Sequence, residues 1–195
     1  MTRLAEQIAF LVEADKLKSV LRRTPLVDSS RLENSAEHSW HLVLTVMVLR
    51  EYGPAGIDWM RVLEMVALHD LVEIDAGDVS AYDVNAFAAK ALREQAAADR
   101  VFGLLPADQR SYFRQLWDEF EAHETAEARF ANAVDRLQPL IQNAHSSGGS
   151  WRNQTLVRAQ ILHRMAPIEA SLPDVWPHVL DVVESFCVAG VLRRE

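Results

Sequence analysis

Apolar residues recur at helical spacing along most of this 195-residue chain, and no stretch alternates apolar and polar side chains as a half-buried strand does. Leu4, Ile8 and Leu11 show this spacing in the first segment, with charged residues between them. The sequence has no internal repeat and no low-complexity segment. The pattern predicts an all-α fold, specifically a single-domain helical bundle.

Capping residues mark the starts of the expected helices. Asn34 stands three residues before Glu37, an arrangement in which each side chain satisfies a free backbone N–H of the other. The helix that starts there is apolar on nearly every face up to Gly53, so we expect it at the centre of the bundle. Asp58 and Thr125 cap two later helices. The other expected elements are an amphipathic helix over residues 2–22, a loop over 22–30, and helices over about 85–102, 106–121, 125–143, 154–166 and 174–192.

Length and composition bound the number of domains. With 49% hydrophobic and 25% charged residues, the 195 residues suffice for one packed core and are few for two. The break over residues 146–150, Ser-Ser-Gly-Gly-Ser, is too short for an interdomain linker. We therefore expect one domain covering residues 1–195.

Charge and cysteine content disfavour several classes of protein. The formal net charge of -8 disfavours binding to polymeric nucleic acid, which needs clustered Lys and Arg. Cys187 is the only cysteine, so the chain has no internal disulfide framework and no cysteine-based zinc cluster. No signal-like segment opens the sequence, and no run reaches the roughly 20 apolar residues of a membrane span. We expect a cytoplasmic protein without membrane partners.

The pair His69-Asp70 ends a strongly apolar run. An ionised carboxylate in such a place needs a charge partner or several hydrogen-bond donors. A metal ion would serve, and so would an N-terminal cap on a neighbouring helix. His38 lies in the first turn of the helix capped by Asn34, where a lone histidine is more often a hydrogen-bonded core residue.

Asp135 is a second carboxylate within an apolar helix. Its ordinary interpretation is a salt bridge to a neighbouring helix. Pro139 follows four residues later, and a helical proline removes the hydrogen bond to the carbonyl four residues before it, which here belongs to Asp135. A distortion at a buried acid favours a functional role.

Together these residues indicate a metal site. His38, His69, Asp70 and Asp135 offer two imidazole nitrogens and two carboxylates, a set that suits one divalent ion such as Mn, Co, Fe, Ni, Zn or Mg. A helical bundle commonly holds such a site in its core. Glu73 lies one turn after the His69-Asp70 pair, where its carboxylate would orient or deprotonate a water molecule.

The order of these residues resembles the HD-domain metal-dependent phosphohydrolases. The local wording is similar to a small subgroup that includes the bacterial 5'-deoxynucleotidases, and the resemblance covers the chain from about residue 9 to the final helix. It is carried by the segments Glu37-His38-Ser39, His69-Asp70-Leu71-Val72-Glu73, Ala76-Gly77-Asp78 and Asp135-Arg136-Leu137-Gln138-Pro139.

The resemblance implies a role for each matching residue. It implies that His38, His69, Asp70 and Asp135 ligate the metal, that Glu73 lies near the attacking water, and that Asp78 helps position water or substrate. Arg23 matches a substrate-contacting arginine. Those enzymes have tryptophan in the next place, where this chain has Thr24. The implied activity is release of phosphate from (deoxy)nucleoside 5'-monophosphates by a homodimer, with the deoxyribose preference left open by Thr24.

Other functions fit parts of the pattern. One is an HD phosphodiesterase or nucleoside polyphosphate hydrolase, although few basic residues lie near the motif in sequence to bind a triphosphate. Another is a non-enzymatic helical protein with a closed structural metal site. We interpret His41 as support for the site or as packing, whereas His123 and His145 would be candidates for a second metal. We expect Arg22 to be solvated or to face a dimer partner.

Overall fold

The computed structural model describes residues 1–78, 87–152 and 154–195, with the backbone alone for 87–89. It contains α-helices, short 3-10 helices (η) and a two-stranded sheet. The elements in chain order are α1 (Arg3–Ala14), η1 (Asp15–Ser19), β1 (Leu21–Pro25), β2 (Leu32–Asn34), α2 (Ser35–Leu49), η2 (Arg50–Tyr52), α3 (Trp59–Leu68), η3 (His69–Val72), α4 (Glu73–Ala76), α5 (Phe87–Phe102), α6 (Ala107–Ala122), α7 (Ala126–His145), η5 (Gly149–Trp151), α8 (Arg158–Ser171) and α9 (Trp176–Val188).

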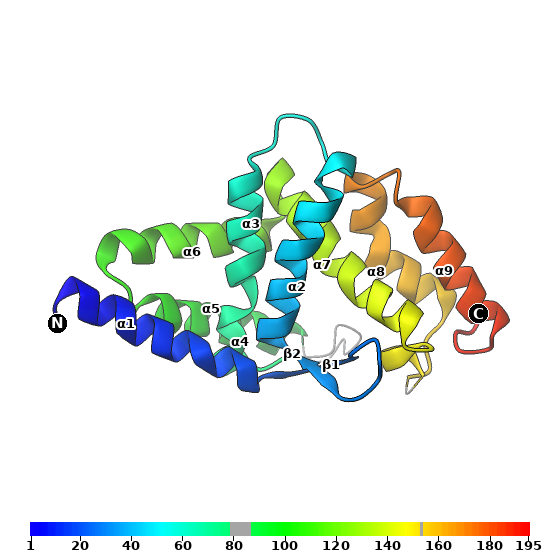
Figure 1. Cartoon of the computed structure of the whole chain (residues 1–195), viewed down its shortest axis with the longest axis horizontal. Helices are drawn as coiled ribbons and strands as arrows, with labels where there is room; N and C mark the ends of the chain where they lie inside the picture. Colours follow the sequence, from blue (N-terminus) through cyan, green and yellow to red (C-terminus); the bar gives the residue numbers. More distant parts are fainter. Residues whose placement is uncertain (79–86, 153) are drawn as a thin grey trace.

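Helix α7 is the centre of the bundle. It packs against α2, α3, α6 and α8, and most of its residues from Ala128 to Asn143 are buried. In Figure 1, α1, α5 and α6 lie on one side of the central helices, and α8 and α9 lie on the other. This arrangement confirms the all-α prediction. None of the helices in the described residues combines the length and apolar character needed to cross a bilayer.

Three of the predicted helix starts, those capped by Asn34, Asp58 and Thr125, are confirmed by their hydrogen bonds, whereas α8 begins at Arg158 and not at about residue 154. Asn34 Oδ1 accepts from the backbone N–H of Glu37 at 2.9 Å, and the Glu37 carboxylate accepts from the backbone N–H of Asn34 at 3.2 Å. Asp58 accepts from the backbone N–H groups of Met60 and Arg61, and Thr125 caps α7 through the backbone N–H of Ala128. These contacts are local in sequence, which is why the sequence reveals them.

The segment after the first helix differs from the prediction. The helix expected over residues 2–22 ends at Ala14 and continues only as η1 to Ser19. Residues 21–25 form strand β1, which pairs antiparallel with β2, although residues 22–25 were expected to be loop. The strands have five and three residues, too few for an alternating pattern to be recognised. Their pairing places β2, which leads directly into α2, beside β1.

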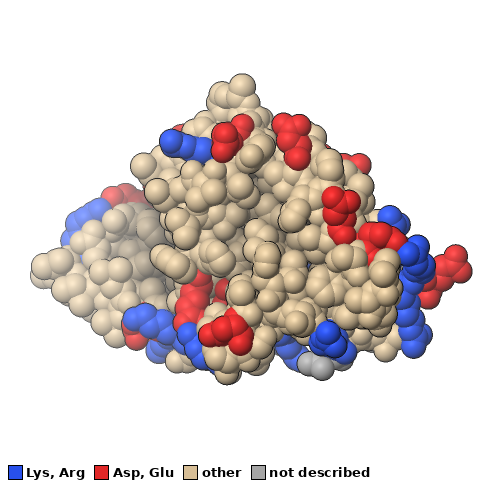
Figure 2. Space-filling model, turned by 45° about the vertical axis from the view of Figure 1, so that its right-hand side comes forward, with Lys and Arg blue, Asp and Glu red and all other residues tan. Residues whose placement is uncertain are grey.

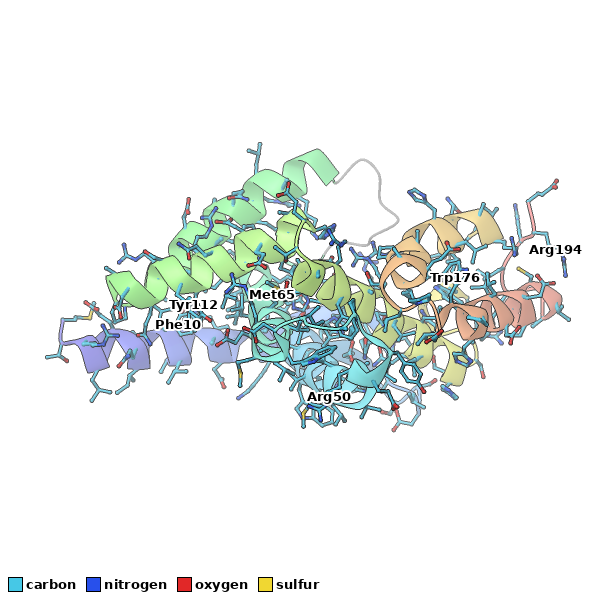
Figure 3. All side chains as sticks on the ribbon, turned by 90° about the horizontal axis from the view of Figure 1, so that it is seen from above. Phe10, Arg50, Met65, Tyr112, Trp176 and Arg194 are labelled. Atoms are coloured by element: carbon cyan, nitrogen blue, oxygen red, sulfur yellow. The ribbon has the colours of Figure 1, made fainter. Side chains whose placement is uncertain are left out.

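Two helices carry apolar stripes that face solvent, contrary to expectation. In α1, Leu4, Ile8 and Leu11 are exposed, with Leu11 66% accessible. In α2, expected to be buried all round, Trp40 is 66% accessible and Met47 is also exposed. Figures 1 and 3 place α1 and α2 along the same side of the molecule. Figure 2, turned by 45° from the view of Figure 1, shows a broad central area without charged side chains.

The opposite face of α1 anchors it to the bundle. Phe10 is buried and its ring meets that of Phe113 of α6 edge to face, with centroids 5.6 Å apart. Figure 3 shows Phe10 on the side of α1 that faces α6, close to Tyr112. Leu17 of η1 is buried as well. The first helix is therefore amphipathic as predicted, but a different set of residues makes its contact with the core.

Candidate metal centre and adjoining cavities

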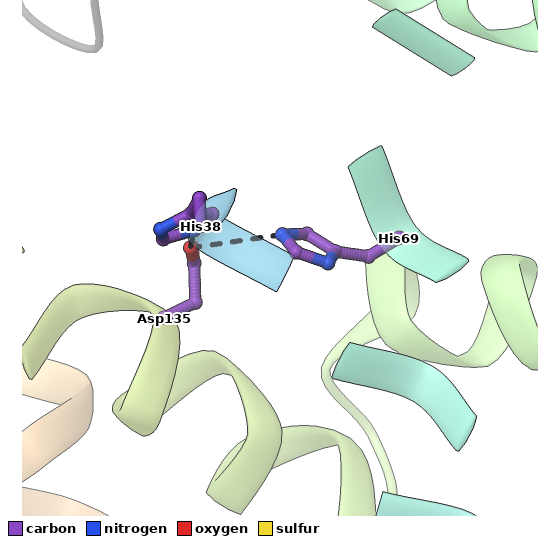
Figure 4. Close-up of side chains that lie close together, drawn as sticks. All are labelled: His38, His69 and Asp135. Atoms are coloured by element: carbon purple, nitrogen blue, oxygen red, sulfur yellow. Dashed lines mark hydrogen bonds and ion pairs between the residues drawn. The ribbon is translucent and has the colours of Figure 1, made fainter. Parts of the chain in front are cut away.

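Three buried side chains converge from segments far apart in the chain. His38 comes from the first turn of α2, His69 from η3 and Asp135 from the middle of α7. One ligand atom of each lies within 4.8 Å of the others (Figure 4). Asp135 Oδ1 is 2.9 Å from His38 Nε2 and 3.7 Å from His69 Nε2. The packing of α2 and α3 against α7 holds the three together.

Hydrogen bonds at Nδ1 set the tautomer of both histidines. His38 Nδ1 lies 2.9 Å from Gln138 Oε1, and His69 Nδ1 lies 3.1 Å from the carbonyl oxygen of Val66. Both partners only accept hydrogen bonds, so each Nδ1 carries the proton and donates it. In the neutral ring, the lone pair is then on Nε2. When the rings are neutral, as metal-ligating histidines are, both Nε2 lone pairs face the carboxylate of Asp135.

Such a cluster favours a positive charge between its members. His69 Nε2 is buried and makes no hydrogen bond within the described part of the chain. Burial opposes a charge on His69, but the Asp70 and Asp135 carboxylates outweigh this and raise its pKa to about 10. Burial likewise opposes ionisation of Asp135, yet Arg136 and the two histidines hold its pKa well below the ordinary value. The donors present thus fit a divalent cation that accepts nitrogen and oxygen ligands.

Asp70 lies at the edge of this cluster. Its Oδ1 is 3.0 Å from His69 Nε2, and its Oδ2 is 4.0 Å from His38 Nε2. It falls outside the mutually close group of three, and its role as a fourth ligand stays a prediction. Arg22 Nη1 donates to Asp70 Oδ2 at 3.0 Å. The other oxygen, Oδ1, remains directed toward His69.

The placement of Arg22 corrects the expectation that it is solvated or dimer-facing. Its side chain is only 14% exposed and lies between Asp70 and Glu33. Burial opposes the guanidinium charge, but Asp70 and nearby acids raise the pKa of Arg22 above its ordinary value. Successive residues of a strand face opposite sides, so Arg22 and Thr24 point inward from β1 while Arg23 is exposed. The sequence alone does not show that Arg22 points inward, because this follows only once residues 21–25 are known to form a strand.

A buried network of polar side chains holds His38 on the Nδ1 side of its ring. Glu33 is 1% exposed and accepts hydrogen bonds from Gln138 Nε2 at 3.0 Å and Gln142 Nε2 at 2.7 Å. Since Glu33 only accepts, it orients the Gln138 amide so that Oε1 faces His38. Gln138 Nε2 also lies 3.0 Å from His41 Nδ1, which fits the supporting role expected of His41. Sequence reasoning missed Glu33 and Gln138, although Gln138 lies on the Asp135 face of α7, three residues on.

Two cavities adjoin the cluster. One of about 150 Å³ reaches β1 and η5, and another of about 290 Å³ lies toward α5 and α6. Asp70, Glu73 and Asp135 line both. Lys90, Arg136 and Arg164 also line both cavities. The cluster is therefore accessible to small molecules from two sides, unlike a closed structural metal site.

Glu73 lines both cavities and has a raised pKa. It is buried, and its Oε2 accepts a hydrogen bond of 2.6 Å from Ser35 Oγ. Burial, followed by the negative charge of Asp70, raises the pKa of Glu73 to about 8. A carboxyl group that exchanges its proton near neutral pH is suited to acid-base chemistry.

The remaining predicted site residues line the smaller cavity. Asp78, Thr24 and the exposed Arg23 contribute to its wall beside Asp70 and Glu73. The structure thus brings every predicted site residue to the cluster or to this cavity, with Arg22 in addition. His123 lines the larger cavity, but neither it nor His145 belongs to the potential metal-binding group found among the described residues.

Comparison with known proteins finds a matching family and similar solved structures. A family model described as HD domain matches residues 14–176. The crystal structure of a predicted metal-dependent phosphohydrolase from Magnetospirillum magnetotacticum MS-1 superimposes with a TM-score of 0.91 at 46% identity, covering 97% of this chain and 98% of that one. A conserved hypothetical protein from Pyrococcus furiosus shares the fold, with a TM-score of 0.63, 20% identity, and coverage of 91% of this chain and 97% of that one.

Curated relatives are more distant. The human 5'-deoxynucleotidase HDDC2 is 26% identical over 137 residues, which span 68% of this chain and 66% of the relative. The mouse 5'-deoxynucleotidase HDDC2 is 27% identical over 110 residues, which span 56% of this chain and 54% of the relative. This chain thus matches about half to two thirds of the length of these relatives. Because the family model matches residues 14–176 and the Magnetospirillum structure superimposes over nearly the whole chain, the chain belongs to the HD-domain family.

Proposed function

We propose that this protein is a divalent-metal-dependent phosphohydrolase that releases phosphate from (deoxy)nucleoside 5'-monophosphates. The observation that carries the proposal is the convergence of two imidazole Nε2 atoms on the Asp135 carboxylate, at the wall of a cavity that also holds Glu73 and arginine side chains. Membership of the HD-domain family supports it, as do the names of the HDDC2 relatives and of the Magnetospirillum protein.

Four residues would hold the metal ion in this proposal. His38, His69 and Asp135 form the compact group, and Asp70 completes the set through the oxygen that faces His69. A bound divalent ion would supply Lewis acidity toward a phosphoryl oxygen and would acidify a water molecule. Arg22 holds the second oxygen of Asp70, and Gln138 holds Nδ1 of His38, so both side chains are oriented before any ion binds.

Glu73 is proposed to handle the proton of the attacking water. Its carboxyl group lines both cavities beside Asp70 and Asp135, and its raised pKa makes it a stronger base than an exposed glutamate. The hydroxyl of Ser35 fixes the orientation of the carboxyl group. Glu73 would accept the proton when water adds to phosphorus and would return it as the ester oxygen leaves.

The smaller cavity is proposed to hold the substrate. Arg23 is exposed at its wall, where a guanidinium group can pair with phosphate oxygens in a two-bond fork. Asp78 lines the same cavity and would position water or a substrate hydroxyl. Thr24 stands next to Arg23 with a small polar side chain, so stacking of an aromatic ring on the sugar is not available from this position.

A homodimer forms part of the proposal. The exposed stripe on α1 repeats at Leu4, Ile8 and Leu11, and the stripe on α2 at Trp40, Leu44, Met47 and Val48 has the same helical spacing. The two helices lie along one side of the molecule (Figures 1 and 3). Large contiguous apolar surfaces on soluble proteins usually mark an interface. A second copy of the same chain, placed through a two-fold axis, would cover both stripes.

The test is a phosphate-release screen. Protein stripped with a chelator is assayed against nucleoside mono-, di-, tri- and cyclic phosphates with each of several divalent metals. We expect turnover only when metal is restored, with the monophosphates as substrates. Absence of metal-dependent phosphate release from every nucleotide would refute the proposed function, and a preference for cyclic nucleotides would instead favour a phosphodiesterase.

Variants separate the roles of the carboxylates in the same assay. Asp70→Ala is expected to lose bound metal, and Glu73→Ala to keep metal but lose turnover. Asp75→Asn is the matched control, because Asp75 lies on the same short helix as Glu73 but is exposed and pairs with Arg100. Equal turnover in Glu73→Ala and the control would remove Glu73 from the mechanism.

A further inference from the structure

Three basic side chains from three different helices line the cavities beside the metal cluster. Lys90 of α5, Arg136 of α7 and Arg164 of α8 line both cavities. Their positions in the chain are far apart, so the sequence shows few basic residues near the motif. The fold nevertheless brings these three basic residues to the walls of the same cavities. The smaller cavity also includes Arg22 and Arg23, and so gathers five of the 20 Lys and Arg residues of a chain with net charge -8.

The charge of this cavity exceeds what its acidic groups offset. Its carboxyl groups are those of Asp70, Glu73, Asp78 and Asp135. With five basic residues and a divalent metal ion, the residues that line the smaller cavity would carry a net charge of about +3. Glu94 and Glu33, just outside this lining, pair with Lys90 and Arg22 and offset part of this charge. Protonation of Glu73, whose pKa burial raises to about 8, would increase it. A phosphomonoester dianion offsets about two of these charges, which leaves room for a further anionic group.

The three basic groups are partly withdrawn from solvent. The Lys90 and Arg136 side chains are 29% and 19% exposed. Arg136 donates to Oδ2 of Asp135, and Lys90 Nζ lies 2.9 Å from Glu94 Oε1, one turn along α5. The other nearby acid is Glu121, whose pKa is raised by burial and then by the negative charge of Glu94. Partly desolvated cations bind anions more strongly than fully hydrated ones.

We propose that Lys90, Arg136 and Arg164 form a subsite for a second phosphoryl group, so that the preferred nucleotide carries two phosphates. One phosphate lies at the metal cluster and is hydrolysed, while the other binds this triad and does not react. The chemistry at the scissile phosphorus is unchanged: a water oxygen bonds to it, its bond to the leaving oxygen breaks, and the water proton passes through Glu73 to that oxygen. The inference rests on the proposed function and extends its substrates from nucleoside monophosphates to nucleotides with a second phosphate, which would bind more tightly.

A second phosphate has two possible positions on a nucleotide. It is attached either to the first phosphate, as in a nucleoside 5'-diphosphate, or to the sugar, as in a nucleoside 3',5'-bisphosphate. Both present the same dianionic group to the triad. Comparing kcat and KM for the two compounds with those for the matching 5'-monophosphate assigns the position, since the compound with the lower KM carries its second phosphate within reach of the triad.

Arg164→Gln and Lys90→Gln test the subsite, each removing one charge from the triad. The control is Arg158→Gln, because Arg158 lies on the same helix as Arg164 but pairs with Glu184 away from both cavities. We expect the wild type to have a KM about tenfold lower for one doubly phosphorylated nucleotide than for the monophosphate, the size expected of one or two charge-assisted contacts. Each test variant should reduce this ratio about tenfold relative to the control.

The inference is overturned if the wild type shows no preference for a second phosphate, or if both variants change the two KM values equally. If no nucleotide is hydrolysed, the proposed function fails but the subsite is still tested by calorimetry with inorganic pyrophosphate and inorganic phosphate. Arg164→Gln must then weaken pyrophosphate binding about tenfold more than phosphate binding. Equal losses for both anions reject the subsite. Melting curves of each variant confirm that it is folded.

Discussion

Gln138 accepts a hydrogen bond from His38 Nδ1 at 2.9 Å and thereby keeps the lone pair of this histidine on Nε2, where it faces Asp135. The amide cannot rotate freely, because its nitrogen donates to Glu33 at 3.0 Å. The buried Glu33 carboxylate, whose Oε2 also lies 3.6 Å from His38 Nδ1, thus helps to determine which nitrogen of His38 is available to a metal ion.

Replacing Gln138 by Met should weaken metal binding roughly tenfold to a hundredfold, the usual effect of losing a group that orients a ligand. The loss of a donor to buried Glu33 should also lower the free energy of unfolding by about 1–3 kcal/mol. Metal affinity is measured by competition with a chelating dye. Gln142→Met is the matched control, since Gln142 also donates to Glu33 but does not bond His38. Gln142→Met should lose similar stability and keep its metal affinity. An equal loss of metal affinity in both variants would contradict the role of Gln138 in orienting His38.

Arg22 and Arg23 are adjacent but should respond differently to substitution by Gln. Arg22→Gln leaves the carboxylates of Asp70 and Glu33 without their cation, and should lower the free energy of unfolding by about 3 kcal/mol. Arg23 is exposed, so Arg23→Gln should change stability by less than about 0.5 kcal/mol. It should raise KM for a nucleotide roughly tenfold if its guanidinium binds the phosphate. Urea unfolding and steady-state kinetics measure both. Unaltered kinetics in Arg23→Gln would remove this arginine from the substrate site.

Glu73→Gln should stabilise the metal-free protein above neutral pH. The folded state raises the pKa of Glu73 from its ordinary 4.5 to about 8, so its stabilising contribution is complete below pH 4.5 and is lost as pH rises through 8. Gln has no proton to lose, so the variant should be more stable than the wild type at pH 9 by roughly 2–4 kcal/mol, with little difference at pH 4.5. Unfolding in urea with chelator at both pH values measures this. A difference that does not change with pH would show that the charge of Glu73 is not responsible.

Leu11→Glu should convert the proposed homodimer to a monomer, because it places a charge in the exposed apolar stripe of α1. The control is Val188→Glu, on α9, which is equally exposed but lies at the other end of the molecule. Light scattering coupled to size exclusion gives the mass of each protein. A monomeric wild type would refute the homodimer, and a Leu11→Glu dimer would place the interface elsewhere.

The residues of the candidate centre were predictable from sequence because each departs from its local context. His69-Asp70 and Asp135 are polar groups in apolar helical segments, and a polar group that is buried needs a partner. Asn34 and Glu37 were recognisable as a cap for a related reason: their hydrogen bonds join residues three apart, so the sequence contains both partners.

Contacts between distant residues were decided by tertiary structure alone. The inward position of Arg22 depends on β1 pairing with β2. Lys90 and Arg164 line the same cavities because α5 packs against η3 and α4 while α8 packs against α7. The same holds for α1, where the apolar stripe visible in the sequence faces solvent while Phe10 packs on the core. The sequence by itself therefore determined the helical class and the capped helix starts, which depend on periodicity and local hydrogen bonds, and the candidate metal ligands, which stand out as polar groups in apolar segments. Only the tertiary structure decided which charges share a cavity and which apolar face is left exposed, because these depend on burial by segments remote in the chain.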